Sequence, residues 1–214
     1  PELMETVAFS LYEYYPQRFK DILIGMSETS GLELKEQLML NALEHYGTLT
    51  GCSGIIAWDA YTDEQKVIIG RNYDWFDRYA EFAKHLTVTV MNPDSGIPNA
   101  IITFAGVIYN TTGMNRDGIF MELNNGLPSG GALTFANRIP AVVSLLSFLN
   151  DYSSLNQIDA AFNSTKNNFA YIINVADKNQ GFTYEWTPFD IKRNAIPNDG
   201  LIVATNHFTD PDRK

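Results

Sequence analysis

The stretch TGCSGIIAWDAYTDEQKVIIGRNYDWF, residues 50–76, decides the fold and contains the only cysteine of the 214-residue chain, Cys52. Two short β-rich segments in it, SGIIAWDA and KVIIGRNYDW, are joined by the polar run YTDEQ, which is the pattern of a β-hairpin. The second strand of such a hairpin turns back towards the start of the first. We therefore expect Arg71 and Asp74, near the end of the second strand, to lie close to Cys52.

The residues before this stretch are predicted to be helical. In ELKEQLMLNALEHYG, residues 33–47, the leucines recur at near-helical spacing, and Gly47 is a suitable helix end. Pro16 interrupts the earlier part, because proline in a helix interior removes a hydrogen bond. The sequence therefore predicts a helical segment over residues 1 to about 46.

The residues after it come in blocks of strands and helices. Strands are predicted at residues 86–92, 99–110, 118–126, 169–177, 181–189 and 200–208. Residues 136–152 and 154–165 have helical patterns, and Ser154 or Asn156 is the expected cap of the second helix. The run TTGMNRDG, residues 111–118, is predicted to be a turn. Because strands and helices are grouped rather than alternating as βαβ units, the expected class is α+β with mostly antiparallel sheets.

Composition and charge exclude several classes of protein. Apolar residues make up 45% of the chain and charged residues 19%, which is ordinary for a globular domain. The net charge of −10 argues against nucleic acid, which is bound by clustered Lys and Arg, and against stable association with an anionic membrane. No apolar run approaches the roughly 20 residues that cross a bilayer. The sequence is compatible with an exported or periplasmic protein and with a cytoplasmic one. It is also compatible with a homo-oligomer.

The sequence indicates neither a metal site nor a cofactor. The chain has three histidines and one cysteine, and they are scattered without the spacing of metal ligands. No glycine-rich phosphate loop of the Rossmann or Walker type is present. A single cysteine also rules out an internal disulfide framework.

Cys52 is the candidate nucleophile, although an isolated cysteine is more often a small buried apolar residue. A thiol needs a base or a positive neighbour to become a reactive thiolate. None of the histidines lies in a recognisable cysteine-protease context. If the chain is cut before Cys52, the new α-amino group, with an ordinary pKa of about 7.7–8.0, can serve as the base. Gly51 keeps the peptide bond to be cut sterically open.

Arg71 and Asp74 complete the candidate site of the predicted hairpin. Arg71 would place a permanent positive charge near the sulfur and so favour the thiolate. Asp74 would accept a hydrogen bond from the new ammonium group and orient it. The alternative is a plain ion pair on the surface, which contributes little.

With its Gly51-Cys52-Ser53 segment and the run GRNYDW, residues 70–75, the chain resembles the choloylglycine hydrolase group of N-terminal nucleophile (Ntn) cysteine hydrolases. This group includes bile salt hydrolases, penicillin V acylases, N-acylethanolamine amidases related to acid ceramidase, and acyl-coenzyme A:6-aminopenicillanic acid acyltransferases. The resemblance covers roughly residues 48–208. It implies a four-layer αββα sandwich and cleavage of non-peptide linear amides by a cysteine that autoproteolysis exposes.

The resemblance also implies roles for particular residues of this chain: the nucleophile Cys52, the thiolate-side arginine Arg71, the amine-side carboxylate Asp74, and the oxyanion-hole asparagines Asn125 and Asn206. Asn125 follows from the match of TTGMNRDGIFMELNNG, in which Asn124 is a close second, and Asn206 from the match of LIVATNHF. Alternatively, Asn125 is a turn residue before a glycine, and Asn206 satisfies local backbone groups at a strand end.

The sequence departs from the family at both ends. About 51 residues precede the cysteine, so residues 1–51 are expected to be a helical propeptide, as in the acyltransferase and acid ceramidase branches, and residues 52–214 the Ntn-hydrolase domain. The family usually continues beyond TNHF and supplies a further arginine, so the chain is expected to lack its C-terminal part.

The expected function is that of an autoprocessing cysteine hydrolase without a cofactor. Its partner would be a small-molecule acyl amide, such as a bile-acid conjugate, penicillin V, an N-acyl amine or an acyl-homoserine lactone. One alternative is an acyltransferase of the same fold. The other is a non-catalytic α+β domain that binds an acyl ligand, with Cys52 buried and uncut. Aromatic residues next to the motif, Tyr73 and Trp75 among them, are expected to line an acyl pocket.

Overall fold

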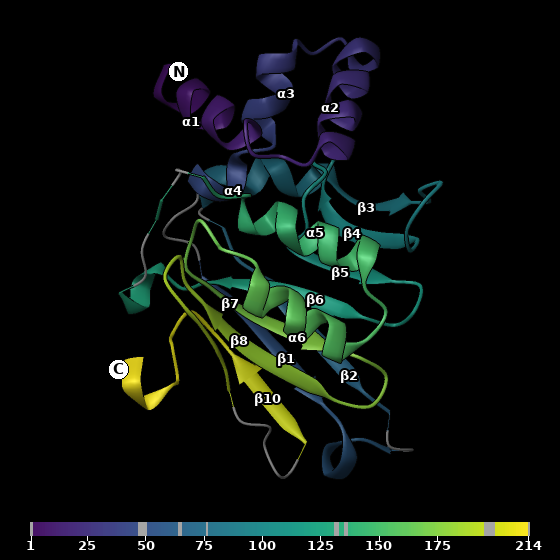
Figure 1. The fold of residues 1–214 in the computed structure, drawn as a ribbon, viewed down its shortest axis with the longest axis vertical. Helices are drawn as coiled ribbons and strands as arrows, with labels where there is room; N and C mark the ends of the chain where they lie inside the picture. Colours follow the sequence, from purple (N-terminus) through teal and green to yellow (C-terminus); the bar gives the residue numbers. More distant parts are fainter. Residues whose placement is uncertain are drawn as a thin grey trace.

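The computed structural model describes residues 2–46, 51–63, 66–75, 77–130, 133–134, 137–194 and 200–213 (Figure 1). In the described part of the chain, four helices precede the first strand: α1 (Glu2–Tyr12), α2 (Gln17–Ser30), α3 (Leu34–Leu40) and α4 (Leu43–Tyr46). The predicted helical segment is therefore confirmed, with Pro16 at the residue before α2.

The predicted helix over residues 33–47 is divided into α3 and α4 at Asn41. The Asn41 side chain donates hydrogen bonds from Nδ2 to the carbonyls of Gln37 and Gly106, and its Oδ1 accepts one from the backbone N–H of Ile108. These bonds tie the helix end to the connection after the strand β4 (Asn99–Phe104). The glycine that was expected to end this helix, Gly47, lies outside the described residues.

The described strands form two antiparallel sheets. The small sheet has the order β10-β1-β2, and the large sheet runs from β3 to β9 in sequence order. The strands of the small sheet are β1 (Cys52–Ala57), β2 (Ile68–Tyr73) and β10 (Leu201–Ala204). Those of the large sheet are β3 (Leu86–Met91), β4 (Asn99–Phe104), β5 (Thr112–Asn115), β6 (Phe120–Asn125), β7 (Tyr171–Ala176), β8 (Gly181–Trp186) and β9 (Ile191–Arg193).

The two sheets face each other, and α5 (Ala141–Asp151) and α6 (Leu155–Ser164) cover the other face of the large sheet (Figure 1). Between the sheets, Ile56 and Ile202 of the small sheet pack against Ala176 of β7. This arrangement confirms the α+β class and the antiparallel sheets. The described residues thus supply a helical layer and two sheets, and the outer face of the small sheet exposes Ile55 and Val203.

The prediction of a turn at residues 111–118 is wrong for the first half of that segment, because β5 occupies it. Gly113 is needed there because neighbouring segments of the chain approach its backbone closely. A Cβ at this position would lie 2.4 Å from Oδ1 of Asn110 and 2.9 Å from the carbonyl of Ala100. The turn itself follows β5, where Oδ1 of Asn115 accepts hydrogen bonds from the backbone N–H groups of Asp117 and Ile119. A glycine in a strand marks such close contacts as often as a turn.

The two predicted helices after residue 135 are confirmed, and their first residues are set by different means. α5 begins after Pro140, whose fixed φ suits a helix start. α6 is capped by Ser154, which accepts a hydrogen bond from the backbone N–H of Gln157, so Asn156 is not the cap. The short edge strand β9 was not predicted from the sequence.

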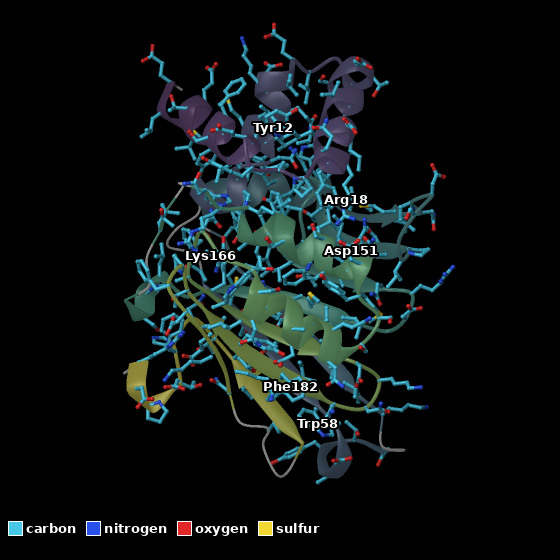
Figure 2. All side chains as sticks on the ribbon, viewed as in Figure 1. Tyr12, Arg18, Trp58, Asp151, Lys166 and Phe182 are labelled. Carbon is cyan, nitrogen blue, oxygen red and sulfur yellow. The ribbon has the colours of Figure 1, made fainter. Side chains whose placement is uncertain are left out.

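The N-terminal helices share one apolar core with the rest of the fold. Leu11, Phe19 and Leu23 belong to the same cluster of buried side chains as Ile101 of β4. A bidentate ion pair joins α2 to the end of α5, with both N···O distances between Arg18 and Asp151 at 2.7 Å (Figure 2). Among the described residues, no helix combines the length and apolar character needed to cross a bilayer.

His45 of α4 is a neutral imidazole within this core. Its side chain lies edge-on to the ring of Phe169, and its Nε2 is 3.0 Å from Nδ2 of Asn168. Burial lowers the pKa of His45 to about 4. The folded protein therefore excludes a proton that the unfolded chain takes up below its ordinary pKa of about 6.5.

The variant His45→Gln is expected to lose less stability on acidification than the wild type. The contribution of neutral His45 is complete above pH 6.5 and disappears as the pH falls towards 4, by about 3 kcal/mol at full effect. Urea unfolding at pH 7 and pH 4.5 measures the difference. The exposed His85, changed to Gln, is the control, and an unchanged acid dependence in His45→Gln would contradict the prediction.

Candidate active site

The pairing of β1 with β2 brings the predicted site residues together. Cys52 is opposite Tyr73, and Gly54 is opposite Arg71. Residues directly opposite each other in an antiparallel pair project from the same face of the sheet. Cys52, Gly54 and Arg71 thus lie on the inner face of the small sheet, towards β6. The expected proximity of Arg71 to Cys52 is present.

Arg71 is a buried guanidinium that reaches from the small sheet to the large one. Its side chain is 9% exposed, and its Nε lies 3.2 Å from Oε2 of Glu122. Nη2 donates to the carbonyl of Leu123 at 2.5 Å, and Nη1 donates to Oδ1 of Asn124 at 2.9 Å. Nε also donates to the hydroxyl of Thr112 at 3.3 Å. The alternative of a plain surface ion pair does not apply to this arginine.

Glu122 of β6 is the counter-ion of Arg71, and the sequence analysis missed it. Its carboxylate is fully buried, and Oε1 accepts a hydrogen bond from Nδ2 of Asn174 at 2.6 Å. Burial raises the pKa of Glu122 to about 7, against the opposing effects of Arg71 and Asn174. Gly54 makes the room, because a Cβ there would lie 1.5 Å from Oε1 of Glu122. A glycine inside a strand and a glutamate inside an apolar strand were the two signals for this contact.

The sulfur of Cys52 lies beside charged and polar groups although the residue is 6% exposed. Burial raises the pKa of the Cys52 thiol. The positive charge of Arg71, together with hydrogen bonds from its guanidinium and from the backbone of Asp74, acts in the opposite direction. The sulfur is therefore a protonated thiol in an environment that can also stabilise a thiolate.

The peptide bond between Gly51 and Cys52 is held at both of its polar atoms. The N–H of Cys52 donates to Oδ1 of Asn206 at 2.7 Å, and the carbonyl of Gly51 accepts a hydrogen bond from the backbone N–H of Asp74 at 3.0 Å. The Asp74 carboxylate accepts hydrogen bonds from Nδ2 of Asn72 at 2.7 and 2.9 Å. A Cβ built on Gly51 would lie 3.9 Å from this carboxylate and 3.8 Å from Oδ1 of Asn206, so both side chains border the peptide.

The candidate asparagines contact the site in different ways. Nδ2 of Asn206 donates to the backbone carbonyl of Asn125 at 2.8 Å, which links the end of β10 to the end of β6. Oδ1 of Asn125 accepts a hydrogen bond from the backbone N–H of Leu127, as expected for a turn residue. Oδ1 of Asn124 accepts a hydrogen bond from Arg71, and the Asn124 side chain also helps to lower the pKa of Glu122. Asn124 is thus a buried amide between Arg71 and Glu122.

A cavity of about 440 Å³ opens next to Arg71, and its walls are mostly apolar. It is lined by Arg71, Tyr73, Trp75, Asp77, Ala80, Ala83, Leu86, Ile102, Phe104 and Thr112. Tyr73 and Trp75 thus lie where the sequence analysis expected a pocket wall, whereas Trp58 belongs to the core between the sheets. A second cavity of about 510 Å³, between α2 and the loop after β3, contains none of the candidate catalytic residues.

Within the described part of the chain, no three His, Cys, Asp or Glu side chains are close enough to hold a metal ion. The groups that the site brings together are a thiol, a guanidinium, the carboxyl groups of Asp74 and Glu122, and several amides. Such a set can form an acyl-enzyme on sulfur and stabilise an oxyanion.

The variant Glu122→Gln is expected to flatten the pH dependence of stability between pH 4.5 and pH 7. The raised pKa means that the folded state binds a proton which the unfolded chain releases above about pH 4.5. The contribution of Glu122 is therefore complete below that pH and is lost as the pH rises through 7, by about 3 kcal/mol at full effect. Urea unfolding at pH 5 and pH 8 compares the variant with Glu13→Gln, a surface control. Parallel profiles for all three proteins would refute the prediction.

Comparison with known families and structures extends these observations. The family model described as acyl-coenzyme A:6-aminopenicillanic acid acyl-transferase matches residues 61–214. The matched residues include Arg71, Asp74, Asn125 and Asn206, while Cys52 precedes them. No curated protein sequence matches the chain.

Solved structures resemble the chain in fold. An N-acylethanolamine-hydrolyzing acid amidase ortholog from Caenorhabditis elegans has a TM-score of 0.58 at 18% identity, over 74% of this chain and 71% of that one. A conjugated bile acid hydrolase from Clostridium perfringens has a TM-score of 0.53 at 15% identity, over 71% of this chain and 52% of that one. The chain thus spans about half the length of the second relative. At these identities, the likeness shows a common Ntn-hydrolase fold.

Proposed function

Because the chain belongs to the acyl-coenzyme A:6-aminopenicillanic acid acyl-transferase family, we propose that it is an Ntn cysteine hydrolase that cleaves a non-peptide linear amide through Cys52. The observation that carries the proposal is the position of the only thiol. Cys52 begins a strand beside the Arg71 guanidinium, and the peptide bond before it is held by Asp74 and Asn206.

The first reaction is a cut in the chain itself. Sγ of Cys52 attacks the carbonyl carbon of Gly51, the C–N bond breaks, and the nitrogen takes the thiol proton. The backbone N–H of Asp74 already donates to the carbonyl oxygen that becomes negative in this step. Water then hydrolyses the thioester, which leaves a carboxylate on Gly51 and a free α-amino group and thiol on Cys52. Residues 1–51 are in this proposal a helical propeptide.

The second reaction uses the new amino group as the base. It takes the thiol proton, and the thiolate attacks the carbonyl carbon of the substrate amide. Arg71 stabilises the thiolate, and Asp74 with Oδ1 of Asn206 holds the ammonium. The ammonium then protonates the leaving amine, and water hydrolyses the acyl-enzyme to a carboxylic acid and the free thiol.

The oxyanion contacts of this reaction are proposed to come from the ends of β6 and β10. Asn125 and Asn206 are joined there by a hydrogen bond, and the buried amide of Asn124 lies in the same strand end beside Arg71. Since one such donor is worth about 10²–10³ in rate, two or three of them supply a large share of the catalysis. The apolar cavity beside Arg71 takes the acyl part of the substrate.

The family name favours one alternative, transfer of the acyl group to a second amine in place of water. This outcome differs only in the last step, and the same site serves both. The non-catalytic alternative, an acyl-binding domain with an uncut chain, requires that Cys52 stay a plain core residue. The charged groups around its sulfur argue against that alternative.

Purified protein is expected to separate into two fragments that meet between Gly51 and Cys52. Intact-mass measurement during incubation detects them, and Cys52→Ala should stay a single chain because it lacks the nucleophile. One unbroken wild-type chain, with no acyl release from bile-acid conjugates, penicillin V, N-acylethanolamines or acyl-homoserine lactones, would remove the proposal. Adding an acceptor amine distinguishes transfer from hydrolysis by its product.

The variant Asn206→Ala is expected to lower kcat of the processed enzyme by about 10²–10³. The change removes an amide that is proposed to donate to the oxyanion, and with it the oxygen that holds the Cys52 nitrogen. Asn163→Ala, on the exposed side of α6, is the matched control. A kcat within twofold of the control would exclude Asn206 from the reaction.

A further inference from the structure

The last helix before the proposed cut places a carboxyl group behind the catalytic strand. Glu44 of α4 is 6% exposed, and its Oε2 accepts a hydrogen bond from the hydroxyl of Tyr73 at 2.6 Å. Tyr73 is the residue opposite Cys52 in the β1–β2 pair, and it lines the cavity beside Arg71. A side chain of the N-terminal helical segment thus reaches the wall of the candidate active site.

Several titratable groups from other elements surround Glu44. The groups that interact with it electrostatically are Arg71 and Tyr73 of β2, Cys52 of β1, Tyr109 of the connection after β4, and Tyr171 of β7. Its neighbour in sequence, His45, faces Asn168 instead. The hydroxyl of Tyr171 is buried and has no hydrogen-bond partner among the described residues, and that of Tyr109 lies beside the backbone of Glu44. Glu44 thus belongs to a buried polar cluster next to the thiol and accepts a hydrogen bond from Tyr73.

Burying the carboxyl group of Glu44 costs folding free energy. Burial raises the pKa of Glu44, against the hydrogen bond from Tyr73 and the charge of Arg71. A buried carboxyl group generally costs more than an apolar residue of similar size would. The ring of Tyr73 is also held by the guanidinium of Arg71, 5.2 Å from its centroid, and by the ring of Trp75 at 5.9 Å. The hydrogen bond to Glu44 fixes the remaining freedom of that ring.

We propose that Glu44 is a positioning residue of the acyl-transfer site, which holds Tyr73 behind Cys52 and makes the N-terminal helical segment a working part of the processed enzyme. This inference rests on the proposed function. In its ionised form, Glu44 raises the pKa of the Cys52 thiol, so the helical segment also tunes the nucleophile. The chain before the cut thus contributes to both the shape of the site and the reactivity of its thiol.

The test compares Glu44→Gln, Glu44→Ala and Tyr73→Phe in the processed protein. Gln can still accept the hydrogen bond from Tyr73 but carries no charge, so the pH midpoint of Cys52 alkylation by iodoacetamide should move to lower pH. Since the chain has one cysteine, the mass gain reports this thiol alone. Ala also releases the Tyr73 ring, so kcat/KM on the cleaved amide should fall about tenfold, because small misplacements near a reacting centre are costly.

Tyr73→Phe keeps Glu44 and removes only its hydrogen-bond donor. The carboxylate keeps its charge but no longer anchors the ring, so kcat/KM should fall while the alkylation midpoint stays near that of the wild type. Glu28→Gln, on the exposed side of α2, is the control. A merely structural role would lower the melting temperature of the Glu44 variants but leave the midpoint and the kcat/KM of the folded protein unchanged. That result in both Glu44→Gln and Tyr73→Phe would overturn the inference.

The two proposals fail in different ways. If the wild type neither cuts itself nor releases an acyl group, the proposed function fails, and alkylation profiles measured on the uncut protein still decide whether Glu44 acts on the thiol. If the wild type is active and the Glu44 variants match the control in both measurements, only this inference fails.

Discussion

The guanidinium of Arg71 is the interaction on which the site depends, because it joins the two sheets at the point where they face each other. From β2 it reaches Glu122, Leu123 and Asn124 of β6, all with hydrogen-bond or ion-pair distances. A charge in this place needs every one of its donors satisfied. The same group lies beside the thiol, so the structural link between the sheets and the electrostatics of the nucleophile are set by one side chain.

This arrangement explains why the site needs a second positive or basic group. Burial keeps the Cys52 thiol protonated despite Arg71, and His45 faces Asn168 rather than the sulfur. A free amino group on Cys52 would supply one at the correct place. Asn206 already accepts a hydrogen bond from the nitrogen that would carry it, and the Asp74 carboxylate borders Gly51, so the site requires little rearrangement after the cut.

The site could be predicted from the sequence where the chemistry lies close along the chain. The hairpin and its charged residues, Arg71 and Asp74, followed from the segment around Cys52. Glu122 and Glu44 could not be found in this way, because their partners are 51 and 29 residues away, respectively, and because a pattern of apolar residues does not say which buried polar side chain faces which neighbour. For the same reason β5 was interpreted as a turn. Its glycine is required by the close approach of Asn110 and Ala100, which exists only in the folded sheet.

The core that the N-terminal helices share with the sheets affects how the molecule would fold before a cut and unfold after it. A single uncut chain brings these helices to the sheet at a fixed local concentration. After a cut, the same contacts would join two separate polypeptides, and recovery from unfolding would become bimolecular and dependent on dilution. The cut form would then be assembled once, as one chain, and its survival would be governed by the rate of unfolding rather than by a reversible equilibrium.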